Sequence, residues 1–168
     1  VDFTKADRIL SLDCDFAGID PQGPAKPFFD RRKPEGAGYE NAPDAGSMNR
    51  LYVVESAYSL TGGMADHRLR VSPTAVLEVA AQIAMGLGVV LPTQVAPITD
   101  QNTIKWIVAM VKDLRAAGSK AVVVAGSRQP AAVHHIALMI NQALGSVGDD
   151  KPVLVVQTEN TGLGSIAS

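Results

Sequence analysis

The feature that most constrains the fold is Ala121–Ala125, a run in which every side chain is apolar and three are valine. Valine favours strands, and a strand without polar side chains is typical of burial on both faces. Segments with the apolar period of a helix stand on either side of this run, at Ile104–Leu114 and Val133–Leu144. Strands that alternate with amphipathic helices indicate a parallel sheet covered by helices.

The rest of the chain follows the same alternation. Short apolar runs predict further strands over Arg8–Leu12, Asn49–Val54, Arg68–Val71 and Val153–Gln157. We therefore predict an α/β fold: a Rossmann-like, open, mainly parallel sheet with helices on both faces, in three αβα layers. A chain of 168 residues is long enough for one such domain, and we expect residues 1–168 to form it.

Capping residues predict where the helices begin and end. Ser72 suits an N-cap and Pro73 the first helical position, while Asn102 suits the N-cap of the following helix. Pro130 is expected to open the last helix. The expected stops are glycines, Gly88, Gly118 and Gly145.

A segment of different composition separates the first two predicted strands. Ten of the twenty-nine residues from Gly18 to Gly46 are Gly or Pro, which excludes a long helix or strand. One helical turn is expected around Phe28–Lys33, and the remainder of residues 18–48 is predicted to be a loop. Loops of this length in a compact domain are usually functional or contact a neighbour.

Composition excludes several classes of function. Fifteen Lys and Arg against seventeen Asp and Glu give a net charge of -2, without the basic excess of a nucleic-acid-binding protein. The single cysteine, Cys14, cannot form an intrachain disulfide or hold an iron–sulfur cluster, which needs about four cysteine ligands. No run of about eighteen apolar residues predicts a membrane span. We expect no nucleic-acid partner, no direct membrane insertion and no metal bound by this chain.

Polar residues or glycines follow four of the predicted strands, and ligands of open α/β sheets bind beyond the carboxyl ends of strands. We expect these residues along one crevice; the alternative is that they are ordinary polar turns. They are Asp13–Asp15, Glu55–Ser56, Gly126–Gln129 and Gln157–Glu159. A glycine after a strand lets a ligand approach, and the next helix offers free amides to an anion. Neither a dinucleotide fingerprint nor a P-loop occurs.

No residue is predicted to be catalytic. His134 and His135 are adjacent on a predicted helix and point about 100° apart, so they cannot bind one ion from the same face. The sequence contains neither H-E-x-x-H nor G-x-S-x-G. Cys14 lies between two acids, which raise the pKa of its thiol and make it a poor nucleophile.

Three strings carry a resemblance to a known family. They are ADRILSLDCDFAG, MNRLYVVESAYSLTGGMADHRLRVSP and VVVAGSRQPAAVHHIALMINQALGSVG. In this order and spacing, from about Lys5 to Val155, the chain resembles the molybdopterin oxidoreductase superfamily. It is most similar to the iron–sulfur large subunit of bacterial alternative complex III, a membrane-bound quinol-oxidising respiratory complex.

The resemblance implies a domain beside a molybdopterin guanine dinucleotide. Strand ends and family motif together give the candidate cofactor-binding residues Cys14, Asp15, Glu55, Ser56, Thr61, Gly62, Asp66, Gly126, Ser127, Arg128 and Gln129. The chain departs from the family pattern in two places. Ser56 and Ala57 stand where active members carry proline and arginine, and Val71–Pro73 replaces an arginine-proline-glycine. These departures favour a scaffold domain without its own redox centre.

The resemblance also implies a setting for that scaffold. The iron–sulfur clusters would lie elsewhere in a longer bacterial parent, which is exported and associated with the membrane on its periplasmic side. The partners would be the parent's remaining domains and other subunits of the complex. Two alternatives stay open: a working part of the cofactor site, and a free-standing nucleotide-binding domain, suggested by AVVVAGSRQP.

The ends of the chain lead to one further expectation. The first residue is Val1, and the last stretch, TENTGLGSIAS, follows a predicted strand without a cap. We expect a piece of a longer protein, and the alternative is a small complete domain with a frayed tail.

Overall fold

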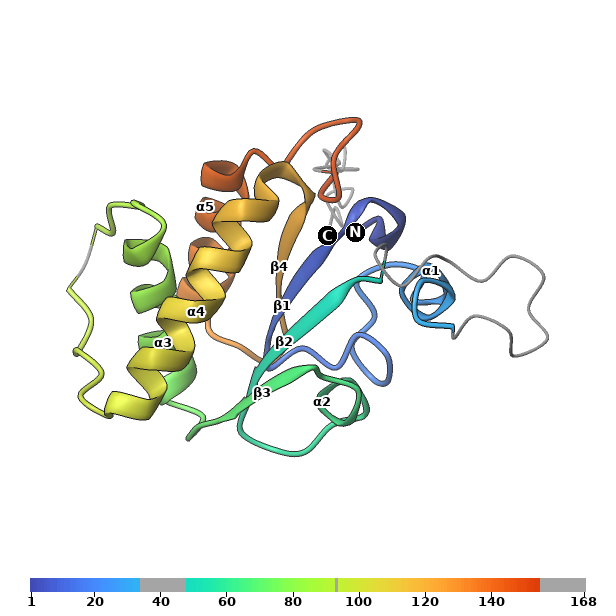
Figure 1. Ribbon diagram of the computed structural model, residues 1–168. Helices are drawn as coiled ribbons and strands as arrows, with labels where there is room; N and C mark the ends of the chain where they lie inside the picture. The colour runs from blue at the N-terminus through green and yellow to red at the C-terminus, as the bar shows by residue number, and fades with distance from the viewer. Residues whose placement is uncertain (34–47, 93, 155–168) are drawn as a thin grey trace, which may run out of the picture.

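The structure, a computed structural model, describes residues 1–33, 48–92 and 94–154. Its centre is one sheet of four strands, in which every neighbouring pair is parallel (Figure 1). The strands are β1 (Arg8–Leu12), β2 (Arg50–Glu55), β3 (His67–Arg70) and β4 (Ala121–Ala125), and they lie in the order β3-β2-β1-β4. The predicted α/β, Rossmann-like open sheet is thereby confirmed.

The two faces of the sheet are covered differently (Figure 1). The three longest helices of the described chain pack on one face: α3 (Ala75–Gly86), α4 (Gln101–Ala117) and α5 (Ala131–Leu144). The other face is covered by the 3-10 helix η1 (Phe3–Lys5), the short α1 (Lys26–Asp30) and the loop after β1. A single turn of helix, α2 (Leu60–Gly63), connects β2 to β3, and the 3-10 helix η3 (Gly118–Lys120) leads into β4.

The period-two alternation of the strands divides the core between these faces. Leu10 and Leu12 of β1 pack against the long helices, whereas Ile9 packs against the opposite cluster. That second cluster is aromatic: Phe16 lies 4.8 Å from Phe3 and 5.2 Å from Phe28, between ring centroids. The apolar run of β4 is buried along its whole length, as its sequence predicted.

Helix stops were easier to predict than helix starts. Gly88, Gly118 and Gly145 have φ of 88°, 54° and 71°, so each follows its helix in a backbone conformation that favours glycine. α3 begins later than its sequence predicts: Ser72 is not its N-cap, and the carbonyl oxygen of Ser72 instead accepts the amide of Ala75 at 3.0 Å in a turn.

The start of α4 also differs from the prediction. Asp100, not Asn102, is the N-cap, and its carboxylate accepts the amide of Thr103 at 2.7 Å. The negative charge of Asp100 also complements the positive end of the helix dipole, which an amide side chain does not. Pro130 is the N-cap of α5 rather than its first residue.

Two predicted segments extend beyond the described residues. Val153 forms an isolated parallel bridge with Val147, and residues 155–157 of the last predicted strand lie outside the described part. Of the predicted loop 18–48, residues 34–47 lie outside it too. No helix in the described ranges combines the length and apolarity needed to cross a bilayer.

The outer side of β4 is occupied at one point by a helix side chain. Asn141 of α5 is buried, and its Nδ2 donates to the carbonyl oxygen of Val123 at 2.8 Å. Its Oδ1 accepts the amide of the same residue at 2.8 Å. The side chain of Asn141 thus makes both hydrogen bonds that a neighbouring strand would make with Val123.

Candidate functional site

The order of the strands locates the candidate site. The chain moves from β1 to β2 and β3 on one side, and then returns as β4 on the other side of β1. In open α/β sheets, the carboxyl ends of the two strands at such a reversal form the usual ligand crevice. The residues that follow these two strands are Asp13 and Gly126. We call the surrounding group, Asp13, Asp20, Ser56, Gly126, Ser127 and Gln129, the switch-point site.

Gly126 admits the chain's own backbone rather than a ligand. Its amide donates to the carbonyl oxygen of Leu12 at 3.0 Å. A Cβ atom at this position would lie 2.1 Å from the carbonyl oxygen of Asp13, so no other residue fits without movement of the backbone. This glycine was predicted to let a ligand approach the backbone. It is instead required by the close contact between Gly126 and the residue that follows β1.

A backbone amide in the turn between β4 and α5 binds a carboxylate. The amide of Ser127 donates to Oδ2 of Asp20 at 2.7 Å, across 107 positions of the sequence. Asp20 was not among the predicted site residues, and nothing in its glycine- and proline-rich surroundings distinguished it. Ser127 precedes Ala131, the first residue of α5, by four positions, so Asp20 places a negative charge in the turn that leads into this helix.

Asp13 connects the ends of three strands. It is the one described non-glycine residue with positive φ, 52°, a conformation that costs a non-glycine residue about 1–2 kcal/mol. Its carboxylate accepts the amide of Ser56 at 3.1 Å and Nε2 of Gln129 at 2.8 Å. These contacts use two more of the predicted site residues. Within the described chain, Arg128 is exposed and Oε1 of Gln129 is buried without a hydrogen-bond partner.

Cys14 does not face the crevice. Its side chain is buried in the aromatic cluster on the α1 side of the sheet. Ser11 Oγ donates to the carbonyl oxygen of Cys14 at 2.7 Å and accepts its amide at 3.2 Å. Burial, reinforced by the nearby Asp20 carboxylate, raises the pKa of the Cys14 thiol far above its ordinary value. The thiol is therefore neither a ligand nor a nucleophile at neutral pH.

Asp15 and Thr61 bind each other. Oδ1 of Asp15 accepts the amide of Thr61 at 2.9 Å and its hydroxyl at 2.8 Å. Partial burial acts to raise the pKa of Asp15, but these two hydrogen bonds outweigh it and hold the pKa below its ordinary value. The pair joins the loop after β1 to α2, and Thr61 is fully buried.

Glu55 is enclosed by its own neighbours. Its side chain is 2% exposed, forms an ion pair with Arg68 and accepts the hydroxyl of Ser59 at 2.6 Å. A Cβ atom on Gly62 would lie 1.9 Å from Oε1 of Glu55, so the glycine leaves room for this carboxylate. A fully desolvated carboxylate requires such partners, and Arg68 and Ser59 supply them here.

Asp66 lies at the amino ends of the strands, opposite the switch-point site. It directly precedes β3, and its Oδ2 accepts the amide of Leu51 at 2.7 Å, near the start of β2. It also forms an ion pair with Arg32. The structure therefore brings Asp13, Ser56 and Gly126–Gln129 together and places Glu55, Gly62, Asp15 and Thr61 beside them. It buries Cys14, whose Sγ donates to the carbonyl oxygen of Asp20 at 3.6 Å, and it separates Asp66 from the crevice.

Two contacts at the switch-point site oppose the binding of a molybdopterin guanine dinucleotide. A pyrophosphate needs free amides and a close approach to the backbone. Here the Ser127 amide holds Asp20, the space beside Gly126 contains the backbone of Asp13, and both aspartates would repel a phosphate. Among the described residues, no group of three or more His, Cys, Asp or Glu is placed to hold a metal ion.

Comparison of the sequence with protein-family models and with curated proteins found no match. The family resemblance drawn from the three strings therefore stays a prediction, and the reading of the site depends on the contacts described above.

Proposed function

We propose that this chain is a scaffold domain of a molybdopterin oxidoreductase-like subunit in a membrane-associated respiratory electron-transfer complex, without a redox centre of its own. The family assignment depends on the sequence resemblance. The scaffold role depends on one observation, the hydrogen bond of 2.7 Å from the Ser127 amide to the Asp20 carboxylate. An internal carboxylate in the turn that leads into α5 gives the crevice a structural use in place of ligand binding.

Electrostatics support this proposal. A hydrogen bond contributes about 0.5–1.5 kcal/mol net to stability, and a phosphate that takes the Ser127 amide would have to displace Asp20 and forfeit that contribution. Such a ligand would also approach the Asp13 carboxylate, which Ser56 and Gln129 hold in the crevice. The departure from the family pattern at Ser56 is consistent with this, because the Ser56 amide serves the protein's own aspartate.

The proposal assigns electron transfer to other parts of the parent. Iron–sulfur clusters would be held by a cysteine-rich region beyond the 168 residues, since this chain has one cysteine. Its partners would be the remaining domains of the parent and neighbouring subunits, on the periplasmic side of a bacterial membrane. The chain alone would not catalyse a reaction.

Metal analysis of the parent protein, purified with its native partners, tests the proposal. We expect iron and acid-labile sulfide but only traces of molybdenum and tungsten, and no guanine nucleotide released on denaturation. Stoichiometric molybdenum with released guanine nucleotide would overturn the scaffold role. Absence of iron as well would overturn the assignment to a respiratory subunit.

A thermal-shift assay on the 168-residue chain tests the site directly. A ligand that binds only the folded state raises the free energy of unfolding, by about 2.7 kcal/mol at a hundredfold excess over Kd. The midpoint temperature of unfolding rises as a result. We expect no rise with GDP or pyrophosphate for the wild type. A rise that Asp20→Ala enlarges, while Asp30→Ala in α1 does not, would identify the crevice as a working anion site.

A further inference from the structure

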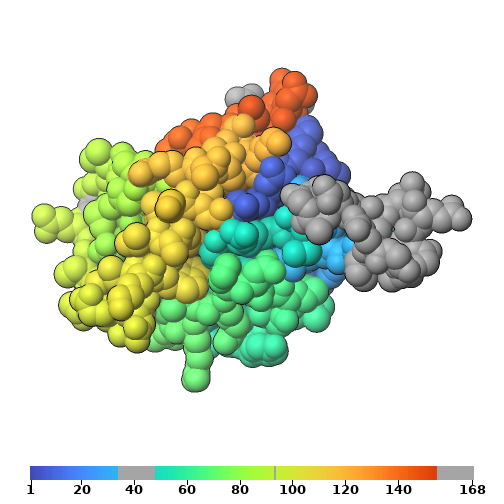
Figure 2. All heavy atoms as spheres, in the orientation of Figure 1, coloured from blue at the N-terminus to red at the C-terminus, as the bar shows by residue number. Residues whose placement is uncertain are grey.

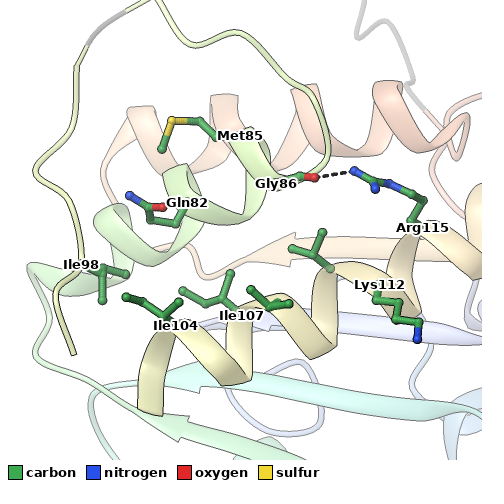
Figure 3. Close-up of a pocket in the computed structure, with 10 residues that line it drawn as sticks. Gln82, Met85, Gly86, Ile98, Ile104, Ile107, Lys112 and Arg115 are labelled. Atoms are coloured by element: carbon green, nitrogen blue, oxygen red, sulfur yellow. Dashed lines mark hydrogen bonds between the residues drawn. The ribbon is translucent and has the colours of Figure 1, made fainter. Parts of the chain in front are cut away.

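A groove lies between α3 and α4 (Figure 3), and none of its lining residues belongs to the switch-point site. Its volume is about 610 Å³, and α3 contributes Met85 and Gly86 to one wall. The opposite wall is α4, which lies at the molecular surface in the space-filling view (Figure 2). The α4 residues that form it include Ile104, Ile107 and Val108. We call this feature the α3–α4 groove.

The groove is apolar and open to solvent. Six of its ten lining residues are aliphatic or methionine, and Val108 and Met85 are 63% and 45% exposed. Exposed apolar area is unfavourable by roughly 25 cal/mol per Å², and contiguous patches of it mark interaction sites. The fold leaves this surface uncovered although α3 and α4 bury their other faces well.

One end of the groove is positively charged. Lys112 and Arg115 lie there, and Ile98 lies at the opposite end (Figure 3). Arg115 donates to the carbonyl oxygen of Gly86, which holds its guanidinium at this end. No acid lines the groove, and within the described chain Lys112 has no ion-pair partner.

The acid of α4 does not offset this charge. Asp113 is the single acidic residue of the helix, and it points to the sheet side. There its Oδ2 accepts Nε of Arg8 at 2.7 Å and the hydroxyl of Tyr52 at 2.8 Å. The groove side of α4 therefore carries positive charge without compensation, and it is complementary to carboxylates.

We propose that the α3–α4 groove binds an amphipathic helix of another polypeptide, with its apolar side chains in the groove and its acidic end beside Lys112 and Arg115. From Ile104 to Arg115 the wall rises about 16 Å, at about 1.5 Å per residue, which matches three turns of a helix with anchors at i, i+4 and i+7.

The openness of the groove favours a helix over an acyl chain. Small-molecule sites bury about 70–90% of their ligand, and a single acyl chain would leave much of its surface in water here. A helix covers the exposed Val108 and Met85 with its own body. This inference does not depend on the proposed function, since it concerns a different face of the molecule.

Two synthetic helical peptides test the proposal. Each has about fourteen residues, which is about four helical turns. Both peptides have the same leucines along one face. In the first peptide, glutamates occupy the polar positions and the end expected beside Lys112 and Arg115. In the second peptide, lysines occupy those positions. Each is titrated into the ¹⁵N-labelled 168-residue chain, and amide chemical shifts are recorded. We expect the glutamate peptide to shift the amides of Gly86, Ile104 and Val108, with an affinity about tenfold higher than that of the lysine peptide. Added salt should reduce this difference.

Variants test whether the peptides bind in the α3–α4 groove itself. Val108→Ser should abolish binding, whereas Val90→Ser, at an exposed valine that does not line the groove, should leave it unchanged. Lys112→Glu should lower the affinity of the glutamate peptide and raise that of the lysine peptide. Because both valines and Lys112 are exposed, the variants should unfold at the wild-type temperature.

Several results would overturn the proposal. They are the absence of binding by both peptides, equal affinities for the two, or shifts confined to other surfaces. Sodium dodecanoate that shifts the groove amides when the peptides do not would identify an acyl-chain site instead. Binding to phosphatidylglycerol vesicles without peptide binding would identify a membrane contact.

Discussion

Replacing Gly62 by alanine tests whether Glu55 is enclosed as the structure describes. A Cβ atom at this position would lie 1.9 Å from Oε1 and 2.5 Å from Cδ of Glu55, both shorter than any real contact. The carboxylate cannot yield freely, because it is 2% exposed and held by Arg68 and Ser59. The variant must therefore displace the carboxylate or shift α2.

The expected change in the free energy of unfolding is the difference between two opposed effects. Alanine gains about 1 kcal/mol over glycine in a helix. Breaking a buried ion pair costs about 3–5 kcal/mol, and the partial exposure of Arg68 places this pair at the low end of that range. The net loss is about 2 kcal/mol. For a chain of this size, such a loss lowers the Tm by roughly 4–8 °C.

Gly63 offers a matched control in the same helix. A Cβ atom there would lie 3.1 Å from the hydroxyl of Tyr58, whose side chain is 74% exposed and can turn away. Gly63→Ala should keep the wild-type Tm or raise it. Circular dichroism during heating measures both variants. Equal stability of Gly62→Ala and Gly63→Ala would refute the enclosure of Glu55 and would leave that carboxylate available to a ligand.

Three further predictions follow from the contacts of single residues. Asp20→Ala should lower the free energy of unfolding by about 1 kcal/mol in urea titrations, because the Ser127 amide loses its charged acceptor; an unchanged midpoint would contradict the contact. Burial acts to raise the pKa of Asp113, but hydrogen bonds from Tyr52 and Arg8 outweigh it and lower the pKa from its ordinary 3.8. Its contribution to stability is therefore present above pH 4 and is lost as pH falls through the lowered pKa, so Asp113→Asn should flatten the pH dependence of Tm below pH 4; a parallel curve would contradict this. The Cys14 thiol should react with a disulfide reagent only after denaturation, because burial excludes the reagent and raises the thiol pKa; rapid labelling of the folded chain would contradict its placement.

Local patterns were sufficient to predict the four strands of the described sheet. Ala121–Ala125 is a strand because β-branched, apolar side chains favour extended structure at any buried position. The glycine stops at Gly118 and Gly145 are equally local, since positive φ is a property of one residue. The N-caps were harder, because Asp100 and Asn102 both suit the role and tertiary packing decides which turn is the first.

The contacts of the site could not be predicted in the same way. Asp20 reaches Ser127 only when the loop after β1 folds back over the end of β4, and no local pattern records this. Glu55 was correctly placed at a strand end, but its enclosure depends on Arg68 of the neighbouring strand. A polar residue at a strand end can serve a ligand or its own chain, and only the folded arrangement distinguishes these uses.

The side chain of Asn141 has a consequence for how this sheet could grow. A protein engineer who adds a strand beside β4 must first remove Asn141, because both backbone groups of Val123 are already bonded to it. The same contact protects against intermolecular strand pairing, the route by which exposed sheet edges start aggregation. A leucine at position 141 would keep the bulk of the side chain and release the edge, so one amide in a helix helps to limit the width of the sheet.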